Sequence, residues 1–95
     1  MKLLTKELQK KLPGYNEVRG EPVAVAKFFT PWSNWTWYAA EYDPATRTFW
    51  GLVDGFEKDY GSFSLAELES LRGPYGLRVE RDRLFTPTPM QELDR

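Results

Sequence analysis

The sequence predicts an α+β domain in which a three- to four-stranded antiparallel meander carries two short helices packed on it. Residues 23–63 contain four runs of β-branched and aromatic residues separated by short turn sequences, a pattern typical of consecutive antiparallel strands. Leucine-rich helical patterns lie on either side of this block, at about residues 5–12 and 64–72. The length of 95 residues fits a single domain, 1–95, with one modest core.

The first helix is indicated by leucines that recur every four residues, namely Leu4, Leu8 and Leu12. Thr5 is suited to the N-cap position, and Pro13-Gly14 ends the pattern. We expect this short helix to dock by its single apolar stripe, because two or three turns are not stable alone. Residues 15–22 are expected to form a loop.

Four strands are expected in the middle of the chain, at Val23 to Phe29, Trp35 to Tyr42, Thr48 to Val53 and about Glu57 to Phe63. The connections have the composition of turns. Pro31 to Asn34 interrupts the first pair, Asp43-Pro44-Ala45-Thr46 has a type I signature, and Asp54-Gly55 is a hairpin signal.

The type I turn at residues 43–46 predicts a register, with Ala40 opposite Phe49, Tyr38 opposite Gly51 and Trp37 opposite Leu52. Because strand side chains alternate between faces, the aromatic residues then divide into two sets. One face carries Tyr38, Ala40, Tyr42, Phe49 and Val53, and the other carries Trp35, Trp37, Ala39, Trp50 and Leu52. Both faces are apolar, so either the C-terminal tail covers the second face or that face binds something.

The second helix begins with a capping box, in which Ser64 and Glu67 satisfy each other's free backbone donors. Phe63 and Leu68 occupy the positions of a hydrophobic staple, and Gly73-Pro74 ends the helix. Beyond a turn at residues 74–76, the chain from Leu77 to Thr86 is expected to be extended. Pro87 and Pro89 stiffen a polar tail.

Composition disfavours several function classes. The net charge of −1 argues against a concentrated basic field of the kind that binds phosphate backbones. Without cysteine or histidine there is no disulfide, thiolate nucleophile, Cys/His zinc site or imidazole base, so we expect no cofactor and favour a non-enzymatic role. No apolar run approaches the roughly 18 residues of a membrane span, and no signal peptide is recognisable. We therefore expect a cytoplasmic protein without a membrane partner.

The densest chemical signal is the segment 28–38, which holds six aromatic residues in eleven positions. Trp35, Trp37 and Trp50 could form a stacking platform for bases, but buried core is the commoner use of such residues, and we favour it. Trp32 lies in a turn with Ser33 and Asn34, where it is either an exposed recognition residue or a lid over the core. Asn34 can adopt a left-handed conformation at little cost.

Charged residues offer two further candidates. Region 72–83 is the most basic stretch and contains Arg72, Arg78, Arg81 and Arg83, which could contact phosphate or an acidic partner. A solvated edge strand protected by its charges is the interpretation we prefer. Asp54, Glu57 and Asp59 lack the alternating ligands of a calcium-binding loop, so we interpret them as a solvated hairpin tip.

The run Lys27-Phe28-Phe29-Thr30-Pro31-Trp32-Ser33-Asn34-Trp35-Thr36-Trp37-Tyr38-Ala39, followed by Glu41-Tyr42-Asp43-Pro44, resembles the signature of a small bacterial family of unknown function. Members of that family are single-domain proteins of about this size, often encoded on plasmids and other mobile elements. The resemblance extends over nearly the whole chain. It implies an identity and a genomic context, and it implies no catalytic or ligand-binding residues.

These observations favour a non-enzymatic binding or regulatory module that acts by protein–protein contact, with either a partner protein or a second copy of the chain. The candidate binding residues are Trp32, Ser33, Asn34, Trp35, Arg78, Arg81 and Arg83. The alternative is a single-stranded nucleic-acid-binding protein in which tryptophans stack on bases and the three arginines contact phosphates.

Overall fold

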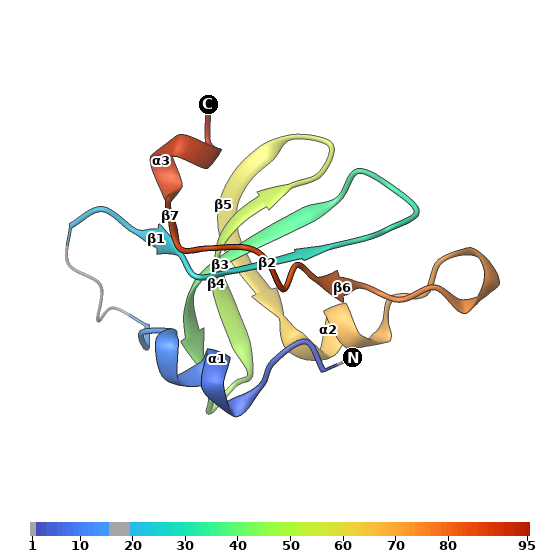
Figure 1. The fold of residues 1–95 in the computed structure, drawn as a ribbon, viewed down its shortest axis with the longest axis horizontal. Helices are drawn as coiled ribbons and strands as arrows, with labels where there is room; N and C mark the ends of the chain where they lie inside the picture. The colour runs from blue at the N-terminus through green and yellow to red at the C-terminus, as the bar shows by residue number, and fades with distance from the viewer. Residues whose placement is uncertain (1, 16–19) are drawn as a thin grey trace.

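A computed structural model describes residues 2–15 and 20–95 of the chain (Figure 1). Its centre is a five-stranded antiparallel sheet of order β5-β4-β3-β2-β6, and a two-stranded sheet pairs β1 with β7. The elements are α1 (Lys6–Lys11), β1 (Val23–Ala24), β2 (Ala26–Phe29), β3 (Thr36–Asp43), β4 (Thr48–Asp54), β5 (Lys58–Ser64), α2 (Leu65–Ser70), the 3₁₀ turn η1 (Pro74–Gly76), β6 (Glu80–Arg81), β7 (Thr88–Pro89) and α3 (Met90–Leu93). The loop expected over residues 15–22 lies partly outside the described residues.

The α+β class is confirmed, but the predicted count of three to four strands was too low. The expected strand from Val23 to Phe29 divides at Val25, and its two halves join different sheets. Two further short strands come from the C-terminal region, where β6 pairs with β2 and β7 pairs with β1. These pairings join segments far apart in the sequence, which local residue patterns do not reveal.

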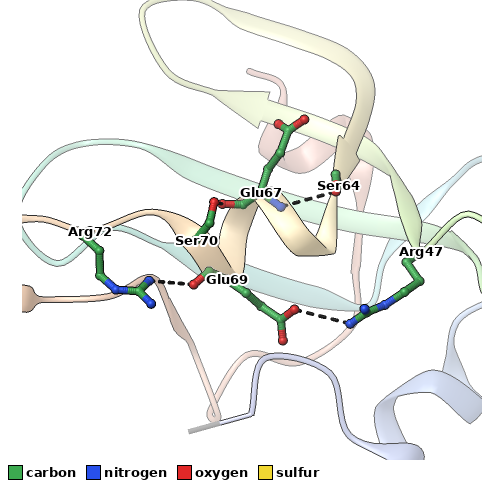
Figure 2. Close-up of polar contacts among 6 residues, drawn as sticks. All are labelled: Arg47, Ser64, Glu67, Glu69, Ser70 and Arg72. Carbon is green, nitrogen blue, oxygen red and sulfur yellow. Dashed lines mark hydrogen bonds and ion pairs between the residues drawn. The ribbon is translucent and has the colours of Figure 1, made fainter.

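Both predicted helix starts are confirmed by their caps. The Thr5 hydroxyl accepts a hydrogen bond from the amide of Leu8 at 3.1 Å, and the Ser64 hydroxyl accepts one from the amide of Glu67 at 3.3 Å (Figure 2). The second helix ends at Ser70, two residues before the predicted end. Its flank is tied to the turn between β3 and β4 by an ion pair of 3.3 Å between Arg47 and Glu69 (Figure 2).

The predicted register of β3 against β4 was wrong by one residue before Ala40 and by two residues after it. Trp37 lies opposite Val53 and Tyr38 opposite Leu52, whereas Tyr42 lies opposite Phe49. The register shifts between Ala39 and Glu41, because Ala40 is the extra residue of a β-bulge. The bulge places Trp37, Ala39 and Tyr42 on one face together with Phe49, and it leaves Tyr38 and Ala40 on the other with Leu52.

Each face of the sheet has its own core. The larger core centres on Phe49, whose ring lies 4.8 Å from that of Tyr42 and 5.3 Å from those of Phe28 and Phe63. The helix α2 and the N-terminal segment cover this face with leucines, namely Leu3, Leu12, Leu65 and Leu68. Burial of such side chains stabilises the fold by roughly 1.5–3 kcal/mol each.

The C-terminal tail covers the second face, which answers the question left open by the sequence. The chain crosses this face between β6 and α3 (Figure 1), and Met90 is fully buried against Ala24, Ala40 and Leu52. The amide of Met90 donates to the carbonyl of Pro22 at 2.9 Å. A polar-looking tail therefore supplies part of the core.

Two basic side chains attach the terminal segments to the sheet. The Arg81 guanidinium donates to the carbonyls of Lys2 and Leu3, at 3.0 and 3.1 Å. The Lys58 ammonium donates to the carbonyls of Leu93 and Arg95, at 3.0 and 2.9 Å. Charge-assisted hydrogen bonds of this kind are the stronger ones, so both ends are held in place.

Gly51 and Gly61 lie opposite each other on β4 and β5 and provide a matched test of this packing. A Cβ on Gly51 would lie 1.8 Å from the backbone oxygen of Tyr38, whereas a Cβ on Gly61 would meet nothing within 4 Å. We expect Gly51→Ala to lower the free energy of unfolding by about 3 kcal/mol or more, and Gly61→Ala to change it by less than about 1 kcal/mol. Urea denaturation of both variants measures this, and equal effects would contradict the close approach of β3 and β4.

Candidate functional site

The turn between β2 and β3 is held from the inside by Thr30, which is buried. The Thr30 amide donates to the carbonyl of Trp35 at 3.1 Å, and the Ser33 amide donates to the carbonyl of Thr30 at 3.2 Å. The Thr30 and Ser33 hydroxyls also contact each other. The turn is therefore well ordered. Asn34 does not adopt the left-handed conformation that is accessible to it, since the positive-φ residues other than glycine in the described ranges are Arg47 and Tyr75.

Two tryptophans at this turn rest on glycines of neighbouring loops. Added Cβ atoms would lie 2.4 Å from the Trp35 ring at Gly55 and 2.2 Å from the Trp32 ring at Gly73, so each ring lies directly against bare backbone. Phe56 packs edge-on against Trp35, with a centroid separation of 5.4 Å. The turn and the loops at 55–57 and 72–78 project toward the same side of the molecule (Figure 1).

An apolar groove of about 370 Å³ opens between these rings. Trp37 is 7% exposed and belongs to the main core, whereas Trp32 and Trp35 are half-buried. We call this feature the tryptophan groove, and its lining is Thr30, Trp32, Ser33, Trp35, Trp37 and Leu71. Its ordered aromatic walls suit an apolar side chain of a binding partner.

A second, more open hollow of about 780 Å³ lies beside the same turn and brings five of the seven candidate residues together. We call it the mixed hollow, and its candidate residues are Ser33, Asn34, Trp35, Arg81 and Arg83. It also contains Asp82, which lies 4.0 Å from the Lys27 ammonium. Arg81 is partly occupied by the carbonyls of the N-terminal segment, so Arg83 is the more exposed of the two arginines.

The two remaining candidates, Trp32 and Arg78, do not line the mixed hollow. Trp32 lines the tryptophan groove, and Arg78 lies on the 72–78 loop directly opposite Arg72. The platform of Trp35, Trp37 and Trp50 is not formed, because Trp50 lies on the other face and stacks on Tyr60 at 5.6 Å. Trp37 is core, as favoured from the sequence.

The residues that shape the groove from neighbouring loops were not predicted from the sequence. Gly55 and Gly73 were interpreted only as turn and helix-ending residues, and Phe56 received no role. Phe56 is 95% exposed beside Trp35, and Leu71 forms part of the groove wall. The signal was present in the two glycines, because glycine often marks a close approach to bare backbone.

Asp43 caps its turn as predicted, accepting from the Ala45 amide at 3.0 Å and the Thr46 hydroxyl at 2.9 Å. Burial, with a smaller contribution from the Asp54 carboxylate, raises the pKa of Tyr38, which leaves this phenol protonated near neutral pH. Over residues 2–15 and 20–95, no group of three or more acidic, histidine or cysteine side chains could hold a metal ion.

A family model described as "Protein of unknown function (DUF2958)" matches residues 3–92. The chain belongs to the DUF2958 family. No curated protein and no solved structure matches this DUF2958 chain significantly. The match supports the sequence-based resemblance to a small family of unknown function. Within the described part of this DUF2958 chain, no helix has both the length and the apolar character needed to cross a membrane.

Trp37 and Trp32 of this DUF2958 chain should differ in their contribution to stability, because Trp37 is core and Trp32 is half-buried at the groove. We expect Trp37→Ala to lower the free energy of unfolding by about 3–5 kcal/mol, and Trp32→Ala to lower it by about 1.5 kcal/mol. Chemical denaturation followed by circular dichroism measures both. If Trp32→Ala unfolds the protein as readily as Trp37→Ala, Trp32 is a structural residue rather than a recognition residue.

Proposed function

We propose that this chain is a non-enzymatic binding module that acts by protein–protein contact through the tryptophan groove. The observation that carries the proposal is the pair of half-buried loop tryptophans, which wall an apolar groove beside the exposed Phe56. Tryptophan is enriched among the residues that dominate protein interfaces. Apolar surface that is exposed to water typically marks an interaction site, so we expect a partner protein to cover this groove.

Preorganisation supports the same proposal. The hydrogen bonds of Thr30 fix the turn, and Gly55 and Gly73 hold the two rings in position. Binding to an ordered surface loses little conformational entropy, so more of the contact energy remains as affinity. On this basis Trp32→Ala weakens partner binding by about 2 kcal/mol or more.

We place this binding activity in the cytoplasm of a bacterium and, from the resemblance of the tryptophan-rich signature to plasmid-encoded proteins, in the service of a mobile element. The absence of histidine and cysteine from the sequence supports a binding role over an enzymatic one.

Site-specific photo-crosslinking in the native host cell tests the proposal. Leu71 lines the groove at the C-cap of α2, and Ala66 is exposed within that helix. We expect the photoreactive residue p-benzoylphenylalanine to give a protein adduct heavier than the 11.1 kDa chain when it replaces Leu71. The control replacement of Ala66 should give little or none. Adduct formation that is absent at both positions, or equal at both, would overturn the proposal.

A second candidate function, single-stranded nucleic-acid binding, is favoured by one observation. The mixed hollow places Phe29 and Trp35 beside Lys27 and Arg83, which combines aromatic surfaces for stacking with cations for phosphate. Asp82 opposes this use because its carboxylate lies in the same hollow. We therefore rank it below protein binding.

Tryptophan fluorescence separates the second candidate from the first. A nucleic-acid-binding chain should show quenching by oligothymidine at low salt, with affinity that falls as salt rises. Arg83→Ala should weaken the quenching, whereas Arg47→Ala should not, since Arg47 pairs with Glu69 at a different turn. Absence of quenching at low salt would remove this candidate.

A further inference from the structure

Residues 72–78 form a small projecting hairpin, which we call the Tyr75 hairpin. Arg72 and Arg78 lie opposite each other at its base, and the Gly73 amide donates to the carbonyl of Leu77 at 2.7 Å. The Leu77 amide donates to the carbonyl of Pro74 at 3.1 Å, which closes a turn. Tyr75 and Gly76 occupy its two central positions with φ angles of 59° and 76°, as in a type I′ turn.

Tyrosine is an unfavourable residue at the tip of this hairpin. A type I′ turn prefers glycine, asparagine or aspartate at its central positions, because bulky side chains are strained at positive φ. The relative exposure of Tyr75 is 104%, so its side chain makes no compensating contact in the described chain. Neither the backbone nor the packing favours tyrosine here. A backbone outlier of this kind at an exposed aromatic residue points to a contact outside the chain.

The tryptophan groove lies between two loops of opposite charge. On the Phe56 side, the end of the β4–β5 hairpin carries Glu57 and Asp59, and the Lys58 ammonium between them donates to the carbonyls of Leu93 and Arg95. On the Gly73 side, the Tyr75 hairpin carries Arg72 and Arg78 without any carboxylate. The ion pairs found across the described residues are Lys27–Asp82 and Arg47–Glu69, so these four charges form no ion pair among themselves or with those residues.

We propose that the occupant of the tryptophan groove is the Tyr75 hairpin of a second copy of this chain. In a two-fold dimer the ring of Tyr75 from each copy enters the groove of the other, and the basic hairpin of one faces the acidic loop of its partner. A two-fold interface brings identical surfaces together, so it requires a self-complementary patch. This surface has a projecting ring beside an apolar groove, and two arginines beside two carboxylates. The inference rests on the proposed function and names the partner.

The dimensions of the groove agree with this occupant. Its volume of about 370 Å³ accommodates a tyrosine ring, and its aromatic walls offer the edge-to-face contacts that aromatic pairs prefer. A stable interface buries about 800 Å² on each partner. One groove with two flanking loops would bury an area at the small end of the range of protein interfaces. We therefore expect a dimer that dissociates on dilution.

Sedimentation equilibrium over a range from low micromolar to near-millimolar protein tests the proposal. We expect the wild-type chain to change from monomer to dimer as its concentration rises, and Tyr75→Asn to raise the dissociation constant of the dimer by about tenfold or more. Asparagine accepts the left-handed backbone, so this variant should fold at least as stably as the wild type, which thermal unfolding checks. Leu84→Asn is the matched control, because Leu84 is also highly exposed, at 90%, but lines the mixed hollow, and it should leave dimerisation unchanged.

Charge reversal tests the pairing of the two flanks. Arg78→Glu and Glu57→Arg should each weaken the dimer, because each places like charges across the interface. The double variant restores opposite charges and should recover most of the lost affinity, more so at low salt. If the losses of dimer affinity in the two single variants add up in the double variant, without recovery, the proposed arrangement is contradicted.

The outcomes separate this inference from the proposed function. A wild-type chain that stays monomeric at every concentration, or a dimer insensitive to Tyr75→Asn, overturns the inference. In that case an adduct between the Leu71 photoprobe and a different protein still supports the binding function, whereas a lack of any specific adduct removes both. An adduct at twice the mass of the chain supports the second copy as the occupant.

Discussion

The β-bulge at Ala40 decides on which side of the sheet the aromatic side chains of β3 lie relative to those of β4. Ahead of the bulge Trp37 and Ala39 face the main core, and the extra residue returns Tyr42 to that same face beyond it. Without the bulge, strict alternation would carry either Trp37 or Tyr42 to the other side of the sheet. The four-ring cluster around Phe49 and the position of Trp37 in the lining of the tryptophan groove both depend on this one residue. Gly51, which lies against the Tyr38 carbonyl, makes the close approach possible.

Because both faces of the sheet are apolar and the chain is short, its terminal segments are needed to cover those faces. The face opposite the main core is closed by Met90, Leu93 and Phe85, which arrive on a segment that looks polar in the sequence. Arg81 and Lys58 then attach the two terminal segments to the sheet by bonds to backbone carbonyls. Since these contacts join residues far apart in the sequence, we expect the domain to unfold as one cooperative unit.

Features set by neighbouring residues were predictable from the sequence, and features set by distant contacts were not. Thr5, Ser64 and Asp43 each indicated a cap or turn, because their short polar side chains accept hydrogen bonds from backbone groups two or three residues away. The pairing of β6 with β2 and the location of Trp50 depend on non-local registers that no local pattern encodes. The groove was predictable only in part. Trp32 and Trp35 were candidate binding residues from the sequence, but the glycines that contact their rings, Gly73 and Gly55, lie in other loops.

The contact of each loop tryptophan with a glycine also makes the groove observable by magnetic resonance. An indole ring shields protons that lie over its face, and the α-protons of Gly55 and Gly73 lie against Trp35 and Trp32 respectively. Their resonances should therefore be displaced upfield from the usual glycine region and respond to any movement of the rings. Two glycines, one on each side of the groove, thus serve as built-in reporters of whether it is open or filled, without any added label.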